Sequence, residues 1–283
     1  MNKHKLLNSF LRWAKLFKKY YQQGNVNNNA IILSYYLLLS LPPIILILGN
    51  LLAHLKIGVK TILNYIIQIT PSDMSNIIKP IINSFLTNGS NSSLSIGILV
   101  TIWSASGLIA TLRRCFNQIY NSSSKQNAIV SRILSFILLL LAFLLFALLL
   151  SIMLFGQYLL KLLKNNFGTS SLGWLTSLLG AKNLIGLVGL FSLLILIYYF
   201  VPQAKIKWRY VWIGAVFTSL GWLLLAQGFQ LYVEYFAQRV SSYQTIGSFI
   251  LLMFWLNFSS SIILIGGVIN ASCQNYFEKV VKF

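Results

Sequence analysis

Apolar residues in this sequence occur in long runs instead of alternating with polar ones. A helix needs about 20 apolar residues to cross the hydrocarbon core of a bilayer. Six stretches reach that length with no charged residue in their middle: 30–53, 94–112, 133–155, 183–201, 210–233 and 246–272. The pattern predicts an all-α, polytopic membrane protein with six transmembrane helices.

Two prolines interrupt the first of these spans near its middle, in the stretch LLLSLPPIILIL. Pro42 and Pro43 remove two backbone donors and free the carbonyls of Leu38 and Leu39. An unpaired carbonyl is costly inside a bilayer, so a neighbouring helix or water must satisfy each one. Ser40 can bond back to the carbonyl four residues before it. We expect a kinked first span, which serves either helix packing or a substrate cavity of the kind many transporters have.

The residues before the first span form a separate amphipathic pattern. On a helical wheel, residues 5–21 gather their cations on one face and their Leu and aromatic residues on the other. That division is typical of a helix lying on an anionic leaflet, although a simple topology anchor has the same pattern. The membrane-contacting side chains predicted from it are Lys5, Arg12, Lys15, Lys18 and Lys19. Shorter amphipathic surface helices are expected at 74–86 and 158–163.

No soluble domain fits between the spans, because the longest region outside them has only about 40 residues, which is too few for an independent core. We therefore expect one integral-membrane domain over residues 1–283. It divides into a basic N-terminal helix at 1–29, the six-span bundle at 30–272 and a short tail at 273–283.

The chain carries a formal net charge of +19, and the position of its cations predicts its orientation. With six spans, both termini lie on the same side, and 15 of the 22 Lys and Arg residues lie on that side. By the positive-inside rule both termini are cytoplasmic. Because the cations lie between apolar runs, the predicted partner is anionic membrane lipid, and no nucleic acid is expected.

Acidic and imidazole side chains are too few and too scattered for metal or acid–base catalysis, which needs several of them at one site. The whole set is Asp73, Glu234, Glu278, His4 and His54. No nucleophile or phosphate-binding motif accompanies them. We therefore expect no enzyme activity, metal or cofactor. Cys115 and Cys273 have no CxxC partner, and we expect them to be free thiols near the reducing side.

Uncharged polar residues concentrate in the first, second, fifth and sixth spans, whereas 133–155 is nearly pure Leu, Phe and Ala. Small polar residues either pack helices together or line a cavity. Arg113 and Arg114 at the inner end of the second span are suited to a phosphate or headgroup, or serve as topology anchors. A substrate path through these spans would include Ser40, Pro42, Pro43, Ser104, Ser106, Arg113, Arg114, Gln227 and Asn257.

Four segments in this order and spacing resemble the YihY/BrkB family of bacterial inner-membrane proteins. They are SYYLLLSLPP (34–43), IWSASGLIATLRRCFNQIY (102–120), YYFVPQAKIKWRYVWIGA (198–215) and IGSFILLMFWLNFSSSIILIGGVIN (246–270). The likeness extends from about residue 29 to residue 270. It implies a multi-pass plasma-membrane protein with six spans and cytoplasmic ends.

The same resemblance implies less about biochemistry. Members have carried a ribonuclease label that is regarded as mistaken, and others are suspected of moving lipids or related envelope molecules. Where the family usually reads Gly-Ala-Glu before the closing Asn, this chain reads Gly266-Gly267-Val268, so any role of that acid is not carried over. The expected function is transport or flipping of an amphipathic, anionic, lipid-like envelope molecule. The alternative is a non-transporting scaffold for envelope-assembly proteins.

Overall fold

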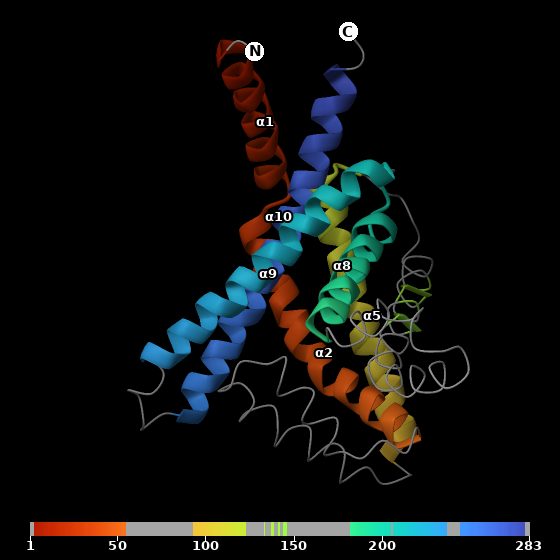
Figure 1. The fold of residues 1–283 in the computed structure, drawn as a ribbon. Helices are drawn as coiled ribbons and strands as arrows, with labels where there is room; N and C mark the ends of the chain where they lie inside the picture. Colours follow the sequence, from red (N-terminus) through yellow and green to blue (C-terminus); the bar gives the residue numbers. More distant parts are fainter. Residues whose placement is uncertain are drawn as a thin grey trace, which may run out of the picture.

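The computed structural model describes residues 3–54, 93–122, 182–204, 206–236 and 244–280, together with six residues between 133 and 145. These residues form helices and turns and no strand, so the all-α prediction is confirmed for the part described. The helices, drawn in Figure 1, are α1 (Lys3–Gln23), α2 (Val26–His54), α5 (Ser93–Ile119), α8 (Lys182–Phe200), α9 (Trp208–Phe236) and α10 (Gln244–Val280).

Five of the six predicted spans coincide with the helices α2, α5, α8, α9 and α10. The largest differences are at the C-terminal ends of α5 and α10, which continue past the predicted limits at 112 and 272 to Ile119 and Val280. At about 1.5 Å per residue, α10 is about 55 Å long and exceeds the thickness of a hydrocarbon core.

The third predicted span, 133–155, is described at six positions, all of them helical. Four of these side chains are exposed, as a lipid-facing helix requires: Ile133, Ile137, Leu141 and Leu144. The predicted surface helices at 74–86 and 158–163 lie outside the described residues.

The backbone of α2 is helical from Val26 to His54, including Pro42 and Pro43. The side chains of both prolines lie outside the described part, and the kink stays a prediction. Ser40 is fully buried, and its hydroxyl donates to the carbonyl of Leu37 at 2.8 Å. The expected partner four residues back is therefore wrong by one position. Both choices are local bonds that a helical serine makes easily.

Within the described residues, two stretches are long and apolar enough to cross a bilayer: Trp208–Tyr232 of α9 and Phe249–Glu278 of α10. In the most apolar part of each stretch, only 28% is buried inside the protein for α9 and 39% for α10. The core helix of a soluble protein would be mostly buried. The remaining apolar surface of these helices therefore suits contact with lipid.

Helix α10 lies at the centre of the described structure. It packs against α9, α2 and α1 and, to a lesser extent, against α5, while α8 covers α9 and α2 packs against α5. The N- and C-termini lie at the same end of the molecule (Figure 1). That arrangement agrees with an even number of membrane crossings between them.

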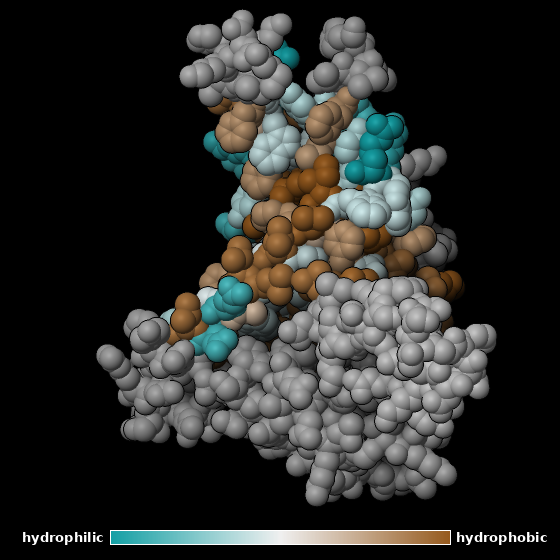
Figure 2. Space-filling view, in the orientation of Figure 1, coloured by the Kyte–Doolittle hydropathy of each residue, from teal (hydrophilic) through white to brown (hydrophobic). Residues whose placement is uncertain are grey.

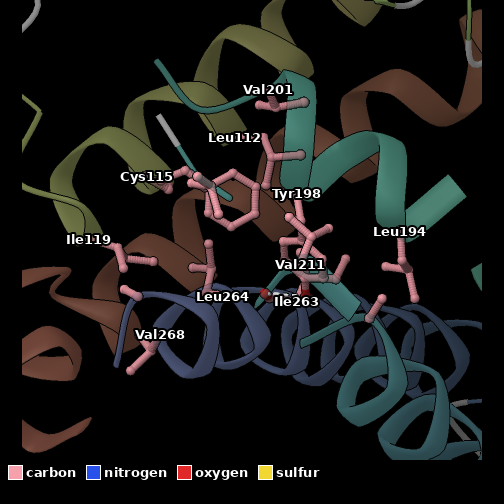
Figure 3. Packing of buried hydrophobic residues seen from close by; sticks show 14 of the residues in the cluster. Leu112, Cys115, Ile119, Leu194, Tyr198, Val201, Val211, Ile263, Leu264 and Val268 are labelled. Atoms are coloured by element: carbon pink, nitrogen blue, oxygen red, sulfur yellow. Dashed lines mark hydrogen bonds between the residues drawn. The ribbon is translucent and has the colours of Figure 1, made fainter. Parts of the chain in front are cut away.

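The main hydrophobic core surrounds the C-terminal half of α10. Its fully buried side chains include Phe116, Tyr198, Val211, Leu264 and Val268, contributed by α5, α8, α9 and α10 (Figure 3). Cys115 also lies in this cluster, and both cysteines are buried free thiols. Val26, Ala30 and Leu33 of α2 belong to the same cluster, so five helices share one core near the end at which the termini lie.

Two glycines allow α9 and α10 to approach closely within this core. A Cβ at Gly214 of α9 would overlap the carbonyl oxygen of Gly266 on α10. A Cβ at Gly266 would in turn overlap the hydroxyls of Tyr198 and Thr218. Small residues at such crossings are the usual way for membrane helices to gain packing contacts.

We therefore predict that Gly266→Ala destabilises the protein by about 1–3 kcal/mol, because the added methyl group has no space. The matched control is Gly228→Ala on α9, where a Cβ would meet no atom within 4 Å. The free energy of unfolding can be measured for both variants by denaturant titration in mixed micelles. Equal stability of the two variants would show that the α9–α10 crossing is looser than described.

Candidate functional site

A buried hydroxyl network joins α8, α9 and α10. The hydroxyl of Tyr198 lies 2.8 Å from the carbonyl oxygen of Ile263 and 2.6 Å from Oγ1 of Thr218. The phenol has one proton, so if Tyr198 donates to Ile263, Thr218 must donate to Tyr198. Figure 3 shows Tyr198 directed from α8 toward Ile263 of α10. One side chain thus links three helices.

A second polar contact joins α9 and α10 one turn further toward the termini. Asn270 is fully buried, and its Oδ1 accepts a hydrogen bond from the backbone N–H of Gly214 at 2.7 Å. Asn270 Nδ2 and the hydroxyl of Tyr120 are also buried, and these two side chains interact with one another. Burial raises the pKa of Tyr120 well above its ordinary value, so its phenol stays neutral.

The C-terminal end of α5 holds the connection between α8 and α9. Nε of Arg113 donates to the carbonyl oxygen of Val201 at 3.1 Å, and Oδ1 of Asn117 accepts from the backbone N–H of Gln203 at 2.9 Å. Val201 follows the last residue of α8, where helix carbonyls lack internal partners and carry partial negative charge. The Arg113 guanidinium, only 5% exposed, therefore caps α8.

The turn between α1 and α2 is fastened to the same end of α5. Asn25 has a positive φ of 41°, and Gly24 before it has no space for a Cβ, which would overlap Ile119. Asn29 Nδ2 donates to the Gly24 carbonyl at 2.6 Å and to Oε1 of Gln118 at 2.9 Å. These contacts fix the turn after which α2 begins at Val26.

A half-exposed ion pair connects the start of α9 to the end of α10. Lys207 Nζ lies 3.0 Å from Oε1 of Glu278, and the Lys207 backbone N–H donates to Oε1 of Gln274 at 3.2 Å. An exposed pair of this kind contributes less than about 1 kcal/mol. Tyr210 stacks on Phe277 beside it, with ring centroids 6.1 Å apart.

Exposed cations are found at the end of the bundle that these contacts define. They belong to α1, to the last turns of α5 and to the beginning of α9: Arg12, Lys15, Lys18, Lys19, Arg114, Lys207 and Arg209. Figure 2 shows hydrophilic side chains toward the terminal end and a hydrophobic band below them, with another hydrophilic group low on the side where α9 ends. Among the described side chains, no three His, Cys, Asp or Glu residues gather into a metal-binding group.

The residues of the predicted substrate path differ in how far they are exposed. Ser40 and Ser106 are buried, Asn257 is half-buried and Gln227 is exposed. Arg113 points inward to cap α8, whereas Arg114 is exposed, so the two do not form a pair at a common mouth. The side chains of Pro42, Pro43 and Ser104 lie outside the described part.

The predicted membrane-contact residues of α1 remain accessible. Arg12, Lys15, Lys18 and Lys19 are exposed, while the side chain of Lys5 lies outside the described part. The opposite face of α1 is partly covered, because its aromatic residues pack against a cluster formed by α9 and α10. That contact comprises Trp13, Phe17, Tyr210, Ile269 and Cys273. Phe10 is 64% exposed, so only the beginning of the apolar face is available to lipid.

Sequence reasoning missed the residues that organise this end of the bundle. In the sequence, Tyr198, Asn270 and Asn117 appear only within the longer motifs, and no motif pattern singles out Asn29. Each is a hydrogen-bonding side chain at the edge of, or inside, an apolar run, where an unpaired polar group is expensive. A hydrogen-bonding side chain in or beside an apolar run is the feature of the sequence that could have pointed to these residues.

The helices, their exposed apolar faces and the cationic end define a helical membrane protein. The comparison with protein families agrees, because residues 17–282 match the family described as Virulence factor BrkB. The chain belongs to this family, as the resemblance of its motifs implied.

Its relatives carry names that describe a membrane protein or a suggested activity. The chain is 32% identical over 235 residues to the "Putative ribonuclease-like protein YfkH" of Bacillus subtilis, covering 82% of this chain and 84% of the relative. It is 28% identical over 196 residues to a UPF0761 membrane protein of Idiomarina loihiensis, covering 69% and 66%. A UPF0761 membrane protein of Aeromonas salmonicida is 27% identical over 208 residues, covering 72% and 68%. No solved structure matches the chain.

The neighbouring arginines allow a controlled test of the α8 cap. A hydrogen bond to a charged group contributes about 1.5–3 kcal/mol, so Arg113→Leu should accelerate hydrogen exchange at residues 197–204 about tenfold or more. Arg114→Leu, next in sequence but exposed, should leave that exchange unchanged. Mass spectrometry of the protein in nanodiscs measures both, and equal acceleration by the two variants would contradict the cap.

Proposed function

We propose that this membrane protein transports or flips an amphipathic, anionic, lipid-like molecule of the bacterial envelope. The observation that supports this proposal is a pair of buried hydroxyls, on Ser219 of α9 and Ser260 of α10, which have no hydrogen-bond partner among the described residues. A polar substrate moving between helices needs such groups on its way.

Serines in membrane helices normally satisfy themselves by bonding to a backbone carbonyl three or four residues back. Ser34, Ser261 and Ser272 do this, at 2.8, 2.9 and 2.7 Å. Ser219 and Ser260 do not, although Ser260 is fully buried and Ser219 only 5% exposed. An unsatisfied buried hydroxyl costs about 1–3 kcal/mol, a cost that a headgroup or an accompanying water would offset.

The cationic end suits an anionic substrate. Arg114, Lys207 and Arg209 are exposed there, and Glu278 is the only carboxylate side chain described near them. Such an excess of positive charge raises the local concentration of anions. The positive-inside count assigns this end to the cytoplasmic side of the plasma membrane, which puts both termini in the cytoplasm.

The hydrogen-bonded inner end corresponds in this proposal to a state closed toward the cytoplasm. Hydrogen bonds hold the helices together there, and they are made by Tyr198, Asn270 and Arg113. Substrate passage would then require α8 and α9 to separate from α10 at these contacts. We propose no catalytic role, because the sequence has only three carboxylates and two imidazoles to offer.

A scaffold is the second candidate, and the great length of α10 favours it. The C-terminal end of α10 continues beyond the predicted span and carries α1 at its side, with the cations of α1 exposed. A protein partner on the cytoplasmic side could bind these helices without any movement of substrate.

Reconstitution into liposomes separates the two candidates. The purified protein should accelerate the inward movement of fluorescently labelled phosphatidylglycerol, followed by dithionite quenching, at least severalfold above empty liposomes. Ser260→Ala should slow this movement, whereas Ser272→Ala, at an equally buried serine of α10 with a satisfied hydroxyl, should not.

A wild-type protein that is correctly folded but moves no phospholipid or lipid precursor, with or without an ion gradient, would overturn the transport proposal and leave the scaffold. Equal rates for Ser260→Ala and the native protein would remove the role given to the unpaired hydroxyl.

A further inference from the structure

A row of aromatic rings covers the elbow between α8 and α9. We call the five residues that form it, Phe191, Tyr199, Phe200, Trp208 and Trp212, the aromatic elbow. Tyr199 contacts Phe200 and Trp208 at centroid distances of 4.9 and 5.3 Å. Trp212 contacts Trp208 at 6.3 Å and Phe191 at 5.7 Å. All four contacts are edge-to-face, so the rings hold one another in fixed orientations.

These rings are ordered by one another and yet remain at the surface. Trp208 is 50% exposed and Trp212 is 46% exposed, and Tyr199 and Phe200 are also exposed. Rings that are buried in a core gain free energy from complete removal from water, which these do not obtain within the chain. Their exposed faces therefore require a partner outside it.

The surroundings of the elbow change steadily from apolar to cationic. Beyond Trp212, the exposed face of α9 continues with Val216, Leu220 and Leu224, which suit contact with lipid chains. Lys207 and Arg209, both exposed, flank Trp208 in the sequence where α9 begins. This order matches the layers of a bilayer. Apolar side chains suit the hydrocarbon, amphipathic rings suit the interface, and cations suit the anionic headgroups.

Arg209 is the cation best placed for a headgroup. Lys207 is partly neutralised by Glu278, 3.0 Å away. Arg209 is next to Trp208 in the sequence, and its guanidinium lies 5.7 Å from the centre of the Tyr210 ring, a contact that limits its orientation. A planar guanidinium can bind a phosphate through two parallel hydrogen bonds.

We propose that the aromatic elbow is a binding surface for anionic phospholipid headgroups on the side of the membrane where the termini lie. Trp208, Trp212 and Tyr199 occupy the headgroup level, and Arg209 binds the phosphate. This surface fixes the depth of the α8–α9 elbow in the bilayer. It goes beyond the proposed transport function, because it holds equally for a transporter and for a scaffold.

Depth-dependent fluorescence quenching tests this assignment. Variants that keep only Trp208, only Trp212 or, as control, only Trp222 are reconstituted into phosphatidylglycerol–phosphatidylcholine vesicles, with the other tryptophans replaced by Phe. Trp222 lies on the same helix, about 21 Å further along its axis from Trp208, and points to the Ser259 carbonyl of α10. Nitroxide labels are placed near the headgroup or deep in the acyl chain.

Trp208 and Trp212 should be quenched at least twofold more by the shallow label than by the deep one, and Trp222 should not show this preference. A headgroup-proximal label on phosphatidylglycerol should quench Trp208 about twofold more than the same label on phosphatidylcholine. The Arg209→Gln variant should abolish this difference. The control variant Arg114→Gln should preserve it.

Strong quenching of Trp208 by aqueous iodide with none by lipid labels would overturn the proposal and place the elbow in water, open to a protein. Stronger quenching by the deep label would also overturn it. If the single-tryptophan variants do not fold, the double variant Trp208→Phe/Trp212→Phe of the otherwise native chain gives the same test. It must lose the part of the tryptophan fluorescence that the shallow label quenches.

Discussion

The hydroxyl of Tyr198 lies where the helices α8, α9 and α10 meet, and it forms hydrogen bonds to the other two. Inside a bilayer no water is available to a stray polar group, so each hydroxyl has to find its partner in the protein. Tyr198 of α8 satisfies this requirement with Thr218 of α9 and the Ile263 carbonyl of α10. The close approach of Gly214 and Gly266 brings the partners within reach, and the surrounding core follows from that crossing. The other polar contacts of this end are arranged around it.

The C-terminal turn of α5 extends this arrangement to the two connections nearest to it. Arg113 and Asn117 hold the residues between α8 and α9, and Gln118 receives the side chain of Asn29 from the start of α2. The terminal end of the bundle is thus one hydrogen-bonded unit, with its remaining cations and the aromatic elbow directed outward. The described helices thus end in a hydrogen-bonded, positively charged region where the termini lie. Any function the protein performs must either use that region as a surface or open it.

Apolar runs were sufficient to predict the helices, because the thickness of the bilayer sets a minimum length that few other structures share. The same runs do not indicate which helices are neighbours, because apolarity sets the length of a membrane helix and not its partners. For this reason Tyr198 and Asn270 were not recognised as partners of α9 and α10. Arg113 and Arg114 illustrate the limit on a smaller scale. A count of cations treats them alike, but adjacent residues differ by about 100° around a helix, so one is buried and the other exposed. The amphipathic pattern of α1 likewise fits a membrane surface and the side of α10 equally well.

A double-mutant cycle on Tyr198 and Thr218 tests the central claim most directly. Unfolding free energies of Tyr198→Phe, Thr218→Val and the double variant, measured in the same micelles, give the coupling energy of the pair. Hydrogen bonds between membrane helices have couplings of about 0.6 kcal/mol on average and about 1.7 kcal/mol at most. The bond of Tyr198 to the Ile263 carbonyl is lost in both backgrounds and cancels in the cycle, so the Tyr198–Thr218 pair itself should give about 0.6–1.7 kcal/mol. A coupling near zero would contradict the account, because it would mean that the three helices are held together without this contact.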